Sequence, residues 1–161
     1  PPMDRSFKEG DIVLTELGPC INGCFVQICR TITIGEPSEA VKRNYKLMTD
    51  AFESSLKFVK PGIPSSEICK EIDRVMTKAG FGDYCKPPYM RVRGHTFHSG
   101  HSNPGNLTED NNRILTEGNV IVIHPNQYFP DSGYLLFGEV VMVGADGPIL
   151  LSGFDRRLRS V

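Results

Sequence analysis

The residues best suited to chemistry lie between Gly94 and Glu139. This stretch holds every histidine of the chain, and a single glutamate within an apolar run closes it. The histidines are His95, His98, His101 and His124. Because imidazole titrates near neutral pH and its neutral form binds metals, such a cluster indicates either an acid–base site or a metal site.

Glu139 lies in a strand-like run, residues 133–143, that is mostly apolar. Burying an unpaired carboxylate in such surroundings is costly, so a buried Glu139 needs a partner. We therefore expect Glu139 to serve the site. The alternative is an edge strand whose polar face lies in water.

A predicted hairpin supplies two more polar side chains. Residues 11–17 and 24–34 are strand-like, and the turn between them contains Asn22-Gly23. Glu16 and Gln27 stand on the two arms and can face one side of the sheet. We expect both to contact substrate. His98 and His101 belong to a loop, where they either contact substrate or lie exposed in solvent.

The remaining elements must position these residues. After the hairpin, Ser38 can cap a helix with one apolar stripe from Val41 to Val59, and a second helix follows and ends at Gly80. Strand-like runs return at residues 119–124, 133–143 and 149–152. This order predicts an α+β fold in which two helices pack on a sheet.

Composition limits the class of protein. The chain has 161 residues, enough for one globular domain, with 18 Lys and Arg against 19 Asp and Glu. The near-neutral charge argues against binding to nucleic acid or an anionic membrane. No apolar run reaches the length of a membrane span, and the start lacks the apolar region of a signal peptide. The five cysteines form no CxxC pair, as in buried free thiols of a reducing compartment, so we expect a cytoplasmic protein.

Motifs along nearly the whole chain resemble those of the creatinase, prolidase, aminopeptidase P and methionine aminopeptidase superfamily. The similar segments are residues 10–18 (G-D-x-V-x-x-D-x-G), 23–31 (G-Y-x-x-D-x-x-R-T), 60–62 (K-P-G), 94–95 (the start of G-H-x-x-G), 117–125 (E-P-G-M-V-x-x-x-E-P) and 138–139 (the final strand glutamate). The resemblance implies the pita-bread fold of this superfamily. Residues 1–161 then form a single domain that lacks most of its first α-β half.

The resemblance also implies where metal ions would bind. Relatives that are metal enzymes hold two divalent ions with two Asp, one His and two Glu, and the corresponding positions here are Glu16, Gln27, His95, His124 and Glu139. Only His95 and Glu139 are unchanged, so two carboxylates remain for two divalent ions. We therefore expect no cofactor. A single divalent metal held by His95, His124 and Glu139 is the alternative.

Creatinase, a superfamily member that resembles this chain in lacking the hairpin aspartates, implies a reaction without metal. In that scheme His95 acts as general base on water, while Glu139 holds the leaving nitrogen and His124 stands where creatinase keeps a glutamate. We expect a hydrolase of a C–N bond, whether amide, amidino or peptide, in a small polar molecule or peptide. The alternatives are an inactive peptidase-like domain used for binding and a mononuclear Xaa-Pro peptidase-like enzyme.

The resemblance finally implies partners. Catalytic domains of the superfamily contain two related halves, so the hairpin and the sheet edge would expose apolar surface without the first half. We therefore expect a companion chain or an N-terminal fragment that completes the fold, and a homo-oligomer.

Overall fold

A computed structural model describes residues 4–22, 24–96 and 105–161. The strands are β1 (Ile12–Leu17), β2 (Cys20–Ile21), β3 (Cys24–Phe25), β4 (Ile28–Thr33), β5 (Gly94–His95), β6 (Val120–Ile123), β7 (Gln127–Phe129), β8 (Gly133–Leu135), β9 (Glu139–Val143), β10 (Pro148–Leu150) and β11 (Arg159–Ser160). The α-helices are α1 (Glu39–Ser55) and α2 (Ser66–Lys78), and short 3-10 helices span Leu56–Phe58 and Gly82–Tyr84. The predicted α+β pattern is confirmed.

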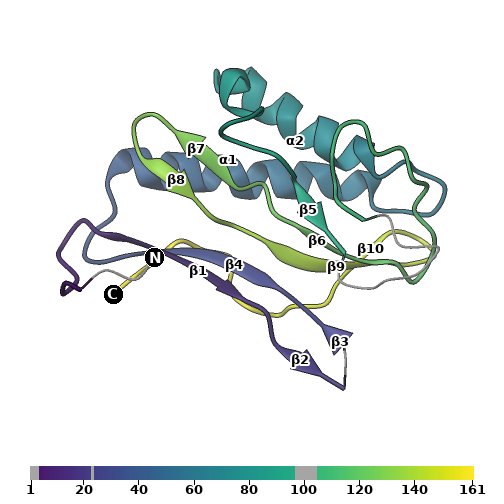
Figure 1. Ribbon diagram of the computed structural model, residues 1–161, viewed down its shortest axis with the longest axis horizontal. Coiled ribbons are helices and arrows are strands. Elements are labelled where there is room, and N and C mark those ends of the chain that lie inside the picture. The colour runs from purple at the N-terminus through teal and green to yellow at the C-terminus, as the bar shows by residue number, and fades with distance from the viewer. Residues whose placement is uncertain (1–3, 23, 97–104) are drawn as a thin grey trace.

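The hairpin and both helices form where local sequence favours them. β1 and β4 pair antiparallel, and the shorter β2–β3 pair at their end projects away from the helices (Figure 1). The backbone N–H of Val41 donates to the Ser38 hydroxyl over 3.3 Å, which caps α1 as predicted. Gly80 follows α2 with a positive φ of 91°, a conformation that glycine adopts without strain.

Two sheets carry most of the chain. One has the strand order β1-β4-β11, and the other has the order β10-β9-β6-β5. A single bridge joins them, because Cys29 N–H donates to the Gly138 carbonyl over 3.1 Å and Gly138 N–H donates back over 3.0 Å. The strand-like run at 133–143 therefore splits: β8 pairs with β7, the chain crosses beside Cys29, and β9 pairs with β6.

Both helices cover the same side of the strands (Figure 1). The core between helices and strands includes Phe137, whose ring meets those of Tyr45 and Phe52 of α1 edge-on at 5.9 and 5.4 Å. Ile123 of β6 and Val141 of β9 are buried in the same core. Alternate residues on these strands must therefore point to the opposite side, away from the helices. Within the described ranges, neither helix combines the length and apolar character needed to cross a membrane.

Candidate active site

The candidate site lies on the side of the joined sheets that faces away from α1 and α2, called the site face below. Glu16 on β1 stands directly opposite Cys29 on β4. Cys29 in turn bridges Gly138, and His124 follows β6 next to Gly138. Side chains of directly paired residues share a face, so this row of pairs brings Glu16, Cys29 and His124 to the site face.

The two histidines of the described ranges meet on this face. His95 on β5 pairs with Val122 of β6, and His124, two residues after Val122, shares the face of Val122. Their ring centroids are 5.4 Å apart, with planes inclined by 60°. His95 is half-buried, whereas His124 is 8% exposed. His98 and His101 lie outside the described residues.

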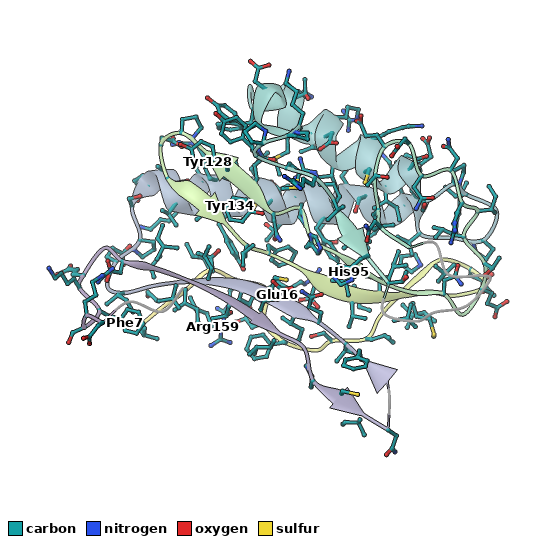
Figure 2. The ribbon with its side chains drawn as sticks, viewed as in Figure 1. Phe7, Glu16, His95, Tyr128, Tyr134 and Arg159 are labelled. Atoms are coloured by element: carbon teal, nitrogen blue, oxygen red, sulfur yellow. The ribbon has the colours of Figure 1, made fainter. Side chains whose placement is uncertain are left out.

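Gln27 lies between β3 and β4, where the strand expected over residues 24–34 is interrupted. Its side chain is buried, and its Nε2 donates to the Cys29 thiol over 3.6 Å. Its Oε1 has no hydrogen-bond partner among the described residues. Glu16, two strands' width away from Gly138, is exposed at the rim of the site. Figure 2 shows Glu16 and His95 on separate strands in the central part of the molecule.

Glu139 is turned away from this site. It pairs with Ile123, and Ile123 belongs to the core beneath the helices, so the Glu139 side chain points to the helix side. There its Oε1 forms a buried ion pair with the Arg30 guanidinium, which lies 5.1 Å from the centre of the Phe137 ring. The expectation that Glu139 needs a partner is met by Arg30. The geometry does not bring Glu139 to His95 and His124, because the pleat puts consecutive side chains on opposite faces.

Gly138 is the residue of this segment that does face the site. A Cβ atom built there would lie 3.0 Å from the Cys29 sulfur and 3.0 Å from His124 Cβ. Such distances are shorter than ordinary van der Waals contact, so a larger residue would require the Cys29 and His124 side chains to shift. The segment therefore contributes backbone, and no carboxylate, to the site face.

Burial sets the charge of the site residues. Burial lowers the pKa of His124 to about 4, with a further contribution from the nearby His95. Burial also lowers the pKa of His95, although the charge of Glu16 opposes the effect. Burial raises the pKa of the Cys29 thiol to about 11. At neutral pH both imidazoles and the thiol are uncharged, and Glu16 carries the negative charge at the rim.

These donors do not fit the metal centre that the resemblance implies. Gln27 is neutral, Gly138 offers no ligand, and the Glu139 carboxylate is bound by Arg30 on the other face. In the described part of the chain, no three His, Cys, Asp or Glu side chains group as a metal site would require. His95, His124 and Glu139 cannot bind a single metal together in this arrangement, because the Glu139 side chain points into the core.

Two site residues escaped the sequence analysis. Cys29 is two positions from Gln27 within the run 24–34 that the sequence predicts as one strand, so the two-residue alternation of a strand would have identified it. Tyr134 of β8 is 38% exposed, and the pKa of its hydroxyl is raised mainly by burial, with the charge of Arg93 opposing and that of Glu16 adding to the effect. The crossing of the chain between β8 and β9 places Tyr134 near the site face, and no local sequence pattern predicts that crossing.

Comparisons with known proteins agree with the fold. Residues 1–145 match the family model described as metallopeptidase family M24. The chain is 26% identical over 155 residues to the Xaa-Pro dipeptidase of Pyrococcus furiosus, covering 96% of this chain and 43% of that protein. A dipeptidase structure from Pyrococcus horikoshii superposes with a TM-score of 0.87 at 28% identity, covering 99% of this chain and 44% of that one.

A prolidase structure from Thermococcus sibiricus gives the same TM-score of 0.87 at 26% identity, covering all of this chain and 43% of that one. These matches confirm the predicted superfamily and its pita-bread fold. The chain spans less than half the length of these relatives.

The position of Glu139 can be tested by stability. Glu139→Ala leaves the Arg30 guanidinium buried without its counter-charge, so we expect the free energy of unfolding to fall by about 3–5 kcal/mol. Glu53→Ala removes the partner of the partly exposed Arg156, and a loss within about 1 kcal/mol is expected. Urea denaturation measures both. Equal losses would contradict a buried Arg30–Glu139 pair.

The burial of His124 predicts a pH dependence of stability. Its pKa in the folded chain, about 4, is below the ordinary value of 6.5, so between these values the unfolded chain binds a proton that the folded chain does not. The free energy of unfolding should therefore fall as pH decreases from 6.5 to 4, by on the order of 3 kcal/mol from this residue.

Denaturation of wild type and His124→Gln across that pH range checks this expectation, because the variant should lose less stability. A His124 ring that titrates near 6.5 by NMR would refute it.

Proposed function

The chain belongs to metallopeptidase family M24, and from this membership and the geometry of its site we propose that it hydrolyses a C–N bond without the pair of metal ions. The bond belongs to a peptide or a small polar amide. The names of its relatives, Xaa-Pro dipeptidase and prolidase, make peptides with proline in the second position the first substrates to test.

The observation that carries this proposal is that a neutral imidazole and a carboxylate lie on one face of the sheets. His95 is half-buried, its pKa is lowered by burial, and the charge of Glu16 acts on it. A neutral imidazole can accept a proton, and a nearby carboxylate stabilises the imidazolium that results. His95 is therefore proposed as the general base and Glu16 as the residue that supports it.

The proposed step is a simple hydrolysis. His95 takes a proton from a water molecule while the water oxygen attacks the carbonyl carbon. The C–N bond then breaks, and the nitrogen leaves with the proton returned from His95, giving a carboxylic acid and an amine. Gln27 contacts the substrate, as expected from the sequence, and His124 takes the role of holding the leaving nitrogen in place of Glu139, because Arg30 binds the Glu139 carboxylate on the other face.

A binding domain without catalysis is the second candidate. Its support is the neutral character of Gln27 and the missing side chain at Gly138, which leave the site with fewer charged groups than a dinuclear peptidase needs. In this case the same face would hold a peptide or small molecule and release it unchanged.

Substitution of His95 tests the catalytic proposal. We expect His95→Gln to lower kcat/KM for Xaa-Pro dipeptides and small amides by about 100-fold or more in chelator-treated protein, since a general base typically contributes that much. Glu53→Gln, at an exposed position on α1, should leave the rate unchanged. Activity that disappears with chelator and returns with added metal would contradict the metal-free reaction. Binding of peptide without any turnover would favour the second candidate.

We also propose that another polypeptide, a companion chain or a second copy, covers the outer edge of β1. In the described sheets β1 pairs with β4 alone, and an edge strand offers unpaired backbone groups to a further strand. Apolar side chains accompany this edge, with Leu17 63% exposed on β1 and Ile21 73% exposed on the adjoining β2. Such a surface is typical of an interface.

Assembly can be measured directly by native mass spectrometry or light scattering. We expect a species larger than the 17.9 kDa chain, and we expect Leu17→Lys to dissociate it by placing a charge in the apolar contact. Ile114→Lys, which adds the same charge at another exposed apolar position, should leave the assembly intact. A wild-type protein that remains a monomer at micromolar concentration would overturn the proposal.

A further inference from the structure

Two buried polar atoms on the site face lack hydrogen-bond partners among the described residues. They are Oε1 of Gln27 and Nδ1 of His124. The Gln27 side chain is 3% exposed and that of His124 is 8% exposed, so solvent contact is nearly absent for both. Buried polar groups without partners are uncommon in native proteins, because each loses its bonds to water without replacement.

The two atoms belong to one small region. Gln27 Nε2 donates to the Cys29 sulfur over 3.6 Å, so its amide is already held from one side. Both the Cys29 sulfur and His124 Cβ lie 3.0 Å from the point where a Cβ of Gly138 would stand. Gln27, Cys29, Gly138 and His124 therefore form a continuous floor, which we call the polar floor.

The polar floor has no ionised side chain of its own. The Gln27 amide is neutral at every ordinary pH, and Gly138 has no side chain. The carboxylate nearest in sequence, Glu139, points to the helix side and is bound by Arg30. Glu16 stands exposed at the rim.

We propose that the polar floor recognises an uncharged amide-type group, such as a primary carboxamide or a urea, and discriminates against a cationic amidine or guanidine. The Gln27 oxygen accepts a hydrogen bond from the amide N–H of the ligand. His124 Nδ1 takes the second bond, as acceptor or donor according to its tautomer. This inference rests on the proposed function and narrows it to amides that carry an N–H, because the bond before a proline has no N–H to donate to Gln27.

A cation fits this floor poorly for a physical reason. An amidinium group that reaches Gln27 and His124 loses its hydration shell and gains no opposite charge at the floor. A neutral amide loses much less hydration and satisfies the same two atoms. The sequence left open whether the substrate is an amide or an amidino compound. Because the polar floor has no carboxylate, it favours the amide.

Three planar probes of matched shape test the inference: benzamide, benzamidine and benzoate. We expect wild-type protein to bind benzamide at least about tenfold more tightly than either charged probe, measured by calorimetry or ligand-observed NMR. Gln27→Ala should weaken benzamide binding by about tenfold, since one hydrogen bond is lost. Equal or tighter binding of benzamidine, or no binding of benzamide, would overturn the inference.

A charge exchange sharpens the test. Gln27→Glu keeps the shape of the side chain and places a carboxylate on the floor, so the preference should reverse towards benzamidine. Asn22→Asp adds the same charge in the turn between β2 and β3, away from the floor, and should keep the wild-type preference. A preference unaltered by Gln27→Glu would refute the role of the floor.

These measurements separate the inference from the proposed function, because none of the probes needs to be turned over. Protein that prefers benzamide but hydrolyses no amide contradicts the proposed hydrolase and leaves the polar floor intact. Protein that hydrolyses its substrate but prefers benzamidine contradicts the polar floor and leaves the hydrolase intact.

Discussion

The contact between Cys29 and Gly138 determines how the rest of the structure is arranged. Two reciprocal backbone hydrogen bonds at this point join the hairpin sheet to the sheet that carries both described histidines. Because a Cβ at Gly138 would lie 3.0 Å from Cys29 and His124 side-chain atoms, glycine lets the two strands approach closely at this point. The register that follows decides which side chains face the site and which face the core.

That register places a buried ion pair on one side of the sheets and the candidate site residues on the other. Arg30 and Glu139, neighbours in sequence of Cys29 and Gly138, fall on the helix side and neutralise each other there. The site face receives a glutamine, a thiol and two imidazoles, all uncharged at neutral pH, with the carboxylate of Glu16 at its rim. The side chains of the site face therefore offer hydrogen-bonding groups, with a single carboxylate at the rim.

Much of the fold was accessible from the sequence, because its signals are local. The Ser38 cap, the glycine after α2 and the turn after β1 each depend on a few adjacent residues, and the motif order identified the superfamily. The orientation of Glu139 could not be predicted from the sequence. A one-residue shift in the register of a strand moves each side chain to the opposite face of the sheet, and the motif at residues 138–139 is too short to exclude such a shift. Gln27 and Glu16 could be placed because both lie on one hairpin, whereas Tyr134 depends on a crossing between sheets.

Arg30 links parts of the chain that lie far apart in the sequence. Its guanidinium donates to the carbonyls of Cys29 and Gly138 at 2.9 and 2.8 Å and to that of Asp155 at 3.1 Å. The last of these partners lies close to the C-terminal end of the sequence. The hydrogen bonds of Arg30 therefore join residues that are up to 125 positions apart in the sequence, and loss of the segment around Asp155 would leave the guanidinium without one of its carbonyl acceptors.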